Sequence, residues 1–334
     1  MTPAVAPAKP SRARSPIVAF TGSWASQIGI TVAFLVVWLL FVIGAPSTFL
    51  NSRIYLAFAQ TTPYFAIVAI FLTMVIVAGD IDLSFVSIMS LSLVGFVFTW
   101  QATGSVELGV VACLAVGALC GLFNGFFVAV VGIPALVVTI ATWFLFQGLT
   151  LMLVNGKSYP LVDATSSFSY EHLFTGKIGT IPIQFVWLIA LAVVAWLLLN
   201  RHRLGQNAYV IGDNAQAAQL MGIPIRRTRI TLFVLVGVAS ALAALMNAFS
   251  LTNFYPNLGS SYQLPTLAAV FIGGTSVFGG RGTIYGTFLG AFMIGGIQAG
   301  IVAVGLTDYY TQFIYGVIIL ATVTIHTLLQ RRFE

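Results

Sequence analysis

The sequence predicts an all-α polytopic membrane protein. Only 7% of its 334 residues are Asp, Glu, Lys or Arg, whereas 59% are hydrophobic, and the mean hydropathy is +1.01. A helix needs roughly 20 apolar residues to cross the hydrocarbon core of a bilayer. Runs of about that length without a charged residue cover 54–79, 178–200, 282–307 and 309–330. The 32 glycines favour closely packed membrane helices, and the alternating stretches of roughly ten residues that mark a β-barrel are missing.

Charges, prolines and glycines divide the chain into ten predicted helices. The uncharged run 108–156 splits at Pro134, which suits the first turn of a helix and restricts the residue before it. The run 230–280 splits at the turn-rich stretch 253–257. The predicted helices are 24–44, 54–78, 84–102, 109–131, 134–154, 182–200, 229–250, 265–278, 283–305 and 309–329. Residues 265–278 are short for a span, so they form either a tilted ordinary helix or a segment whose backbone lines a cavity.

The basic residues predict the orientation. Ten crossings place both termini on one side, which then holds all basic residues except Arg53, Lys157 and Lys177. Basic residues favour the cytoplasmic side, so both termini are predicted to be cytoplasmic, and the net charge of +6 reflects topology rather than nucleic-acid binding. The expected organisation is a disordered cytoplasmic segment 1–16 followed by a single transmembrane domain 17–334. That domain has a periplasmic loop at 155–181 and a cytoplasmic loop at 201–229.

The sequence carries no catalytic or metal-binding constellation. It has no HExxH motif, no GxSxG elbow and no paired Cys and His residues. Gly156-Lys157-Ser158 resembles part of a phosphate loop, but Leu151 occupies the position of the required first glycine. Cys113 and Cys120 are seven residues apart on one predicted helix, which is too far for a disulfide. We expect a chain that is not an enzyme and binds no metal.

The cytoplasmic loop 201–229 is the most informative polar segment. Asp213 or Asn214 can cap a short helix, residues 215–221 can continue it, and Gly222 with Pro224 can end it. A helix of two turns is marginal on its own in water, so another surface must pack on it. That surface is either a groove of another protein or the cytoplasmic face of this chain.

Four stretches of the sequence match the pattern of one protein family. The loop has G-x-N-x-x-A-A-x-x-x-G-I at Gly212, Asn214, Ala217, Ala218, Gly222 and Ile223. The other stretches are GDIDLSFVSIMSLS at 79–92, GIPALVVTIATWFLFQGL at 132–149 and GGTSVFGGRGTIYGTFLGA at 273–291. Together they resemble the permeases of ATP-binding-cassette (ABC) importers of the ribose/xylose/arabinose type. The resemblance spans roughly residues 55–325, and the block at 273–291 is its most specific part.

This resemblance implies a permease with the type II ABC importer-like fold in the bacterial inner membrane. The implied partners are a second permease copy or homologue, cytoplasmic ATPase subunits and a periplasmic sugar-binding protein. ATP and Mg would bind to the ATPase rather than to this chain. The implied substrate is a neutral monosaccharide or related polyol, with nucleosides or branched-chain amino acids as alternatives. A secondary transporter driven by an ion gradient is the rival from a different class.

The resemblance also assigns an ATPase-coupling role within the loop. The residues concerned are Asp213, Asn214, Ala217, Ala218, Leu220, Gly222 and Ile223. The family often has acidic residues just after the asparagine, whereas Ala215 and Gln216 stand here. This departure weakens the case for an ion pair in the loop but leaves docking of the helix intact.

Two further turns are predicted on the cytoplasmic side. Asp80 and Asp82 precede the third helix, which Asp82 or Ser84 can cap; coupling to the ATPase and proton relay are the alternatives. The second turn consists of Gly279, Gly280, Arg281 and Gly282. Its glycines permit close approach of the backbone, which favours a structural turn over an ATPase contact or a gate.

The candidate substrate path is uncharged. Amides within predicted helices can hydrogen-bond hydroxyl groups, and aromatic rings can stack on sugar faces. The amides are Asn124, Gln147, Asn247 and Gln298, and the rings are Trp143 and Phe144. Hydrogen bonding between helices is the alternative role for each amide. The lack of charge deep in the predicted helices favours a neutral substrate.

Overall fold

The computed structural model describes residues 16–303, 305 and 308–333. The predicted disordered segment 1–16 lies, except for Pro16, outside the described residues. The helices are α1 (Pro16–Gly44), α2 (Pro46–Phe49), α3 (Ser52–Thr61), α4 (Pro63–Val77), α5 (Phe85–Thr103), α6 (Val106–Phe126), α7 (Ala135–Val154), α8 (Ile183–Asn200), α9 (Arg203–Asp213), α10 (Ala215–Leu220), α11 (Ile225–Ser250), α12 (Gln263–Ile272), α13 (Ile284–Ala303) and α14 (Asp308–Phe333). Two antiparallel pairs join β1 (Tyr159–Pro160) to β4 (Asn253–Phe254) and β2 (Lys177–Ile178) to β3 (Ile181–Pro182).

The predicted all-α membrane class is confirmed. Within the described residues, seven helices are long and apolar enough to cross a membrane, and an eighth span results if the bent pair α3–α4 counts as one. A shorter apolar helix covers Tyr310–Thr324 within α14. The exact number of spans and the side on which the termini lie stay predictions.

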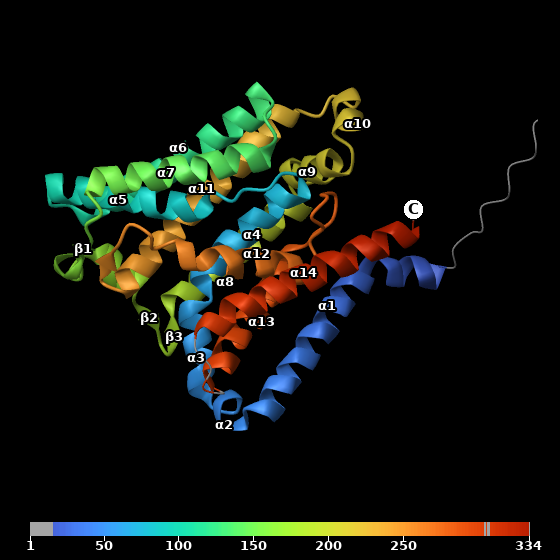
Figure 1. Cartoon of the computed structure of the whole chain (residues 1–334), viewed down its shortest axis with the longest axis horizontal. Coiled ribbons are helices and arrows are strands. Elements are labelled where there is room, and N and C mark those ends of the chain that lie inside the picture. The colour runs from blue at the N-terminus through green and yellow to red at the C-terminus, as the bar shows by residue number, and fades with distance from the viewer. Residues whose placement is uncertain (1–15, 304, 306–307, 334) are drawn as a thin grey trace, which may run out of the picture.

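Helix α4 forms the centre of the bundle (Figure 1). All of its residues are buried, and it packs against α8, α11, α12 and α13. On one side of it, α5, α6, α7 and α11 form a group, and α1, α13 and α14 lie on the other side. Its sequence, PYFAIVAIFLTMVIV, is uncharged and almost wholly apolar on every side, and a helix that is hydrophobic all round belongs in such a buried position.

The predicted helix 54–78 is broken in the structure. It divides into α3 and α4, which meet at Thr62 and Pro63 with a bend of 54°. Proline has no backbone N–H to donate and its ring crowds the preceding turn, so it bends a helix. The prediction placed Pro63 inside a continuous helix and was wrong there.

The predicted helix 265–278 is also shorter than expected. Helix α12 ends at Ile272, and Gly274 follows with a φ of +82°. Ten helical residues reach about 15 Å, half the thickness of the hydrocarbon core. A tilted ordinary span is therefore excluded for α12, and the segment 273–283 continues as irregular backbone.

Other boundaries shift by a few residues. Helix α6 begins at Val106, because the Ser105 Oγ accepts the Leu108 N–H at 3.2 Å and caps it. Its last turn widens to a π-helical turn at Phe127–Val131 before Gly132. Helix α11 begins directly after Pro224, four residues before the predicted start at 229, so residues 225–228 of the predicted cytoplasmic loop are helical.

Glycines on α6 bring it close to α11. A Cβ at Gly117 would lie 2.7 Å from the Ala241 Cβ, and one at Gly121 would overlap the Phe233 carbonyl oxygen. On the facing helix, a Cβ at Gly237 would overlap the Gly117 carbonyl oxygen. Small residues allow such backbone contact between membrane helices, and here they fix the two helices at van der Waals distance.

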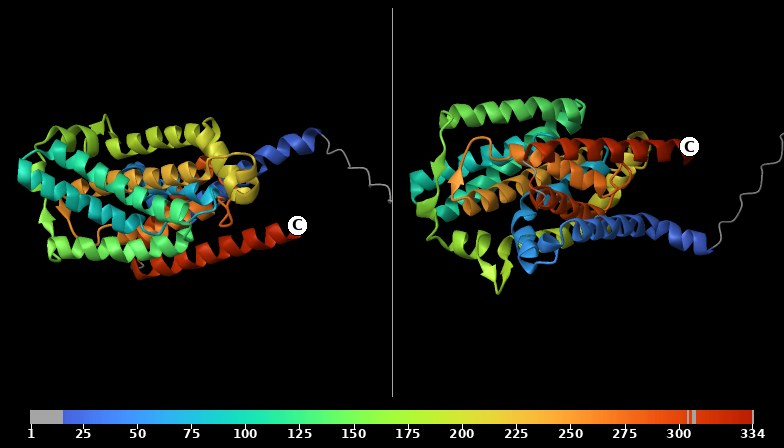
Figure 2. Two further views of the ribbon diagram at one scale, coloured as in Figure 1. Left: turned by 90° about the horizontal axis from the view of Figure 1, so that it is seen from above. Right: turned by 60° about the horizontal axis from the view of Figure 1, so that its bottom comes forward.

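The bundle has two distinct ends (Figures 1 and 2). Helices α9 and α10 occupy one of them, which we call the α10 end. The described start of α1 and the end of α14 lie there too. The short strands β1–β4 lie at the opposite end, which we call the strand end.

Candidate functional site

Helix α10 is a short capped helix at the α10 end. Asn214 has an extended backbone, with φ −156° and ψ 103°, and its Oδ1 accepts the Ala217 N–H at 2.9 Å. Asp213 is the last residue of α9, so Asn214 is the cap of the two candidates. Gly222 follows the helix with a φ of +75°, a conformation that glycine adopts without a steric penalty.

The two faces of α10 differ in their surroundings. Ala218 is fully buried where α10 packs on α9 and α11. In contrast, Leu220 is 91% exposed and Met221 is 70% exposed, and Ala217 is exposed as well. Ile223 is half-buried beside the helix. Helix α10 therefore presents a small apolar surface at the tip of the molecule.

Helix α9 was not predicted. His202 caps it, with Nδ1 accepting the Leu204 N–H at 3.1 Å. Ala208 and Ile211 are buried against the bundle, and α9 packs on α4 and α8. The helical spacing of residues 204, 208 and 211 carried this information, but the polar residues between them obscured it.

The end of α9 meets two other segments of the chain, and we call this contact the glycine junction. A Cβ at Gly212 would overlap the Val77 carbonyl oxygen at the end of α4. The Gly280 N–H donates to that same oxygen at 2.9 Å. Gly279, with a φ of +84°, approaches Gly79 so closely that a Cβ there would lie 2.9 Å from the Gly79 Cα. Backbone thus touches backbone where α4, α9 and the turn 273–283 meet.

The turn that contains Arg281 is held by its backbone. The Ser276 N–H donates to the Arg281 carbonyl oxygen at 2.9 Å, and the Tyr209 hydroxyl of α9 donates to the Gly282 carbonyl oxygen at 2.7 Å. The Arg281 side chain is exposed. The four predicted turn residues therefore lie beside the end of α9, although more than 60 positions separate them from it in the sequence.

Asp80 forms an ion pair at the same end. Its Oδ2 lies 2.8 Å from the Nε of Arg229 in the second turn of α11. Burial raises the pKa of the Asp80 carboxyl to about 6, against the lowering effect of the Arg229 guanidinium. The pair links the loop after α4 to the helix that follows α10.

Asp82 organises the start of α5. Its Oδ1 accepts the backbone N–H of Ser84 at 2.8 Å and the Ser84 hydroxyl at 2.6 Å. The Asn124 side-chain amide of α6 donates to that hydroxyl oxygen at 2.7 Å. Burial raises the pKa of Asp82 to about 6, opposed by the hydrogen bonds from Ser84. Asn124 thus lies at the α10 end, in a polar cluster that ties α5 to α6.

The other predicted substrate-path residues lie in different surroundings. Gln147 donates to the Pro256 carbonyl oxygen at 3.0 Å and Asn247 donates to the Tyr262 hydroxyl, so both amides hold the segment between β4 and α12. Trp143 stacks on Phe144 with the ring centres 5.5 Å apart. Phe144 is 69% exposed, and Gln298 on α13 is exposed too.

A pair of tyrosines that was not predicted accompanies Asn247. The rings of Tyr64 on α4 and Tyr262 lie 6.3 Å apart in an edge-to-face arrangement. Aromatic rings and an amide therefore meet near the strand end. The apolar neighbours of Tyr64 in α4 gave no indication of this contact.

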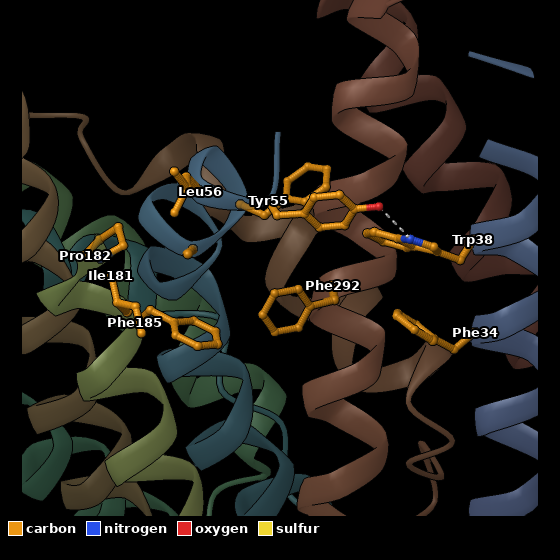
Figure 3. Close-up of a pocket in the computed structure, with 10 residues that line it drawn as sticks. Phe34, Trp38, Tyr55, Leu56, Ile181, Pro182, Phe185 and Phe292 are labelled. Atoms are coloured by element: carbon orange, nitrogen blue, oxygen red, sulfur yellow. Dashed lines mark hydrogen bonds between the residues drawn. The ribbon is translucent and has the colours of Figure 1, made fainter. Parts of the chain in front are cut away.

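A cavity of about 440 Å³ lies between α1, α3, α8 and α13 (Figure 3). Its lining is almost wholly apolar and includes Phe34, Phe185 and Phe292. Its indole and phenol groups hydrogen-bond to each other, because Trp38 Nε1 donates to the Tyr55 hydroxyl at 3.4 Å. This cavity has few groups for recognising a hydroxylated solute.

Metal ligands do not cluster in the part of the chain that the structure describes, where no three His, Cys, Asp or Glu side chains are placed to hold an ion. Cys113 and Cys120 are both buried free thiols on α6.

Comparison with known proteins places the chain in a family. The family model described as "Branched-chain amino acid transport system / permease component" matches residues 54–323. An autoinducer 2 import system permease protein LsrD from Salmonella typhi is 32% identical over 259 residues, which cover 77% of this chain and 78% of that protein. The protein of the same name from Yersinia pseudotuberculosis serotype O:3 is 30% identical over 297 residues, covering 88% and 89%.

The matches agree with the apolar helices that are long enough to cross a membrane. The predicted recognition and the predicted transport role are confirmed by them. The chain belongs to the branched-chain amino acid transport system / permease component family and is the multi-pass membrane permease of an ABC importer.

Proposed function

We propose that this permease imports a neutral, sugar-like solute, either autoinducer 2 or a monosaccharide. The relatives at 30–32% identity are autoinducer 2 import permeases. No charged residue occurs in 230–280 or 282–307, the segments that contain most of α11 and all of α12 and α13. A path without charged side chains offers hydrogen bonds and ring faces, which suit a hydroxylated neutral molecule.

The observation that carries the coupling role is the exposed tip of α10. Leu220 and Met221 are apolar side chains with 91% and 70% of their surface exposed, at the end of a capped helix whose other face is buried. In our proposal this tip inserts into a groove of an ATPase subunit. ATP and Mg²⁺ bind to that subunit, a second permease completes the path, and a periplasmic binding protein delivers the solute.

The glycine junction gives the ATPase a route to the membrane helices. When α10 moves with the ATPase, α9 moves with it, and the contact of Gly212 with Val77 passes the displacement to α4. The ATPase must contact α10 differently in its two states for this coupling to work. Substitutions at the tip should therefore act on the complex without disturbing the bundle.

The coupling role is tested by replacing Leu220 with aspartate. We expect L220D to lose co-purification with the ATPase subunit and to lose ATP-driven uptake, while its melting temperature stays within about 2 °C of the parent, because surface changes cost little stability. The matched control is Leu251→Asp, an exposed apolar position at the other end of α11. An L220D variant that still co-purifies in full yield would refute the coupling role of α10.

The substrate class is tested separately with the complete importer in proteoliposomes. Uptake of autoinducer 2, ribose and leucine is compared, each delivered by the cognate binding protein. Uptake of leucine alone would overturn the proposed substrate and support an amino-acid permease. Uptake of either sugar-like solute would support it.

A further inference from the structure

A groove with three arginines lies beside α10. It has a volume of about 600 Å³, and we call it the arginine groove. One wall is the start of α11, which carries Arg226, Arg227 and Arg229, and the other is α10, which contributes Gln216 and Gln219. The segment before the loop adds one residue to the lining of the groove, Ala129 in the π-helical turn after α6.

The charge of the groove is only partly balanced. Arg229 pairs with Asp80 at 2.8 Å, whereas Arg226 and Arg227 are exposed and form no ion pair with any residue that the structure describes. Three guanidinium groups against one carboxylate leave a net charge of +2. The first residues of α10, Ala215 and Gln216, are uncharged, so α10 supplies no counter-charge of its own.

The location of these arginines adds to the imbalance. Arg226 and Arg227 are the second and third residues of α11. The first turn of a helix carries a partial positive charge and favours anions over cations. The two positive side chains in that turn are therefore repelled by the partial positive charge of the helix end and by each other. An anion bound from outside the chain would reduce both repulsions.

We propose that the arginine groove receives a patch of Asp and Glu side chains on the ATPase subunit. Carboxylates match the planar guanidinium with paired hydrogen bonds. The glutamine amides on the opposite wall can donate to the same oxygens. The groove is bounded by α10 itself, so the partner that covers Leu220 and Met221 also covers the groove. This inference rests on the proposed function and names the chemistry of the ATPase surface.

The apolar tip of α10 and the arginine groove contribute to docking in different ways. The apolar tip of α10 supplies contact area, and the flanking arginines set the orientation in which the ATPase binds. Complementary charge favours specificity and the rate of association. It also makes binding sensitive to salt, since ions screen exposed charges within about 8 Å at physiological ionic strength.

The test compares two charge reversals of equal size. In one variant Arg226→Glu is combined with Arg227→Glu, and in the control Arg201→Glu is combined with Arg203→Glu, which changes the same loop outside the groove lining. Affinity for the ATPase is measured in nanodiscs at low and high salt. We expect the groove variant to weaken binding at least tenfold at low salt and less at high salt. The control should change binding no more than threefold.

Two results of the affinity measurement would overturn the inference. One is equal weakening by the two pairs, which would indicate a general charge effect, and the other is unchanged affinity for the groove variant. A second measurement, binding to vesicles of phosphatidylglycerol, tests whether the groove holds lipid instead. If the groove variant lost vesicle binding but kept its ATPase affinity, the groove would be a lipid headgroup site and the proposal would be wrong.

The result is separable from that of the proposed function. If L220D abolishes ATPase binding and the groove variant does not, coupling through α10 stands and only the acidic patch fails. If neither changes binding, the proposed function itself fails. Thermal unfolding of each variant establishes that the chain is folded in every comparison.

Discussion

Single residues at the α10 end combine burial with charge. Asp82 is completely buried, yet only its Oδ1 has a hydrogen-bond partner among the described residues, because the Ser84 N–H and hydroxyl both point to that atom. Burying a carboxylate with one oxygen unsatisfied is costly, which is why its pKa is raised to about 6. Between the ordinary value of 3.8 and a pH of about 6, the native state therefore keeps a proton on Asp82 that the unfolded chain has lost.

This shift predicts a pH dependence of stability. Between about pH 6 and about pH 4 the native state binds more protons than the unfolded state, so the contribution of Asp82 to the free energy of unfolding rises as the pH falls. The Asp82→Asn variant has no titratable group at this position. We compare the melting temperatures of D82N and the parent at each pH. As the pH falls from about 7.5 to about 5, we expect the melting temperature of D82N to fall relative to that of the parent, because only the parent gains stability from Asp82. A difference independent of pH would contradict the raised pKa.

Gly212 is the second residue whose size matters. A Cβ there would overlap the Val77 carbonyl oxygen and lie 2.6 Å from the Gly280 nitrogen, so Gly212→Ala must separate α9 from α4. We expect a loss of about 1–3 kcal/mol in stability, typical of overpacking. We also expect at least a tenfold loss of uptake with ATPase binding retained.

The matched control for G212A is Gly148→Ala in α7. A Cβ at Gly148 has nothing within 4 Å, and alanine favours a helix more than glycine does. This variant should keep the stability and the uptake of the parent. Normal uptake by G212A would show that the glycine junction does not transmit motion.

At the scale of elements, the fold depends on helices that touch through glycine. Helix α11 packs on α6 through Gly237, which faces Gly117 and Gly121. Because lipid provides no hydrophobic drive for helices to associate, close packing between small residues holds them together. This pair also positions α11, whose first turn carries the arginine groove.

The Gly237→Val variant tests this packing. The added side chain would overlap the Gly117 carbonyl oxygen, so α6 and α11 must move apart. We expect a loss of about 1–3 kcal/mol or more in stability and a lower yield of folded protein in detergent. Gly29→Val on α1, where a Cβ meets nothing within 4 Å, is the control; equal melting temperatures for the two variants would disprove the contact.

At the scale of the whole molecule, the question is which source of energy drives transport against a gradient. The described residues form a helical bundle with two strand pairs of two residues each, and the chain belongs to a family of permease components. Transport against a gradient is then expected to follow ATP and not the proton gradient. Asp80 and Asp82 both lie at the α10 end and not at the middle of a span.

This expectation can be measured in cells or vesicles in which ATP is held constant. Addition of a protonophore should leave the rate of solute uptake close to its initial value, because the proposed source of energy is unchanged. Removal of ATP should abolish uptake. A collapse of uptake on addition of the protonophore at constant ATP would favour a secondary transporter.

Composition and local motifs were enough to predict the membrane class, the short capped helix of the 201–229 loop and the family. These features depend on local composition: uncharged runs set the spans, and Asn214 and Gly222 delimit α10 within a few residues. The break at Pro63 was overlooked, although proline marks it, because the apolar pattern continues across it. Helix α9 was missed as well, because the polar residues between Leu204, Ala208 and Ile211 obscure their helical spacing.

Which distant residues meet depends on how the helices pack against one another. Val77, Gly212 and Gly280 are separated by more than 60 positions from one another, and only the packing of α4, α9 and the turn 273–283 brings their backbones together. Asn124 and Asn247 look alike in sequence, but one serves the α10 end and the other the strand end. The spacing of apolar residues along a helix determines which of its side chains are buried. The way the helices cross determines which residues those side chains contact, and glycine at a crossing determines how closely the two backbones approach.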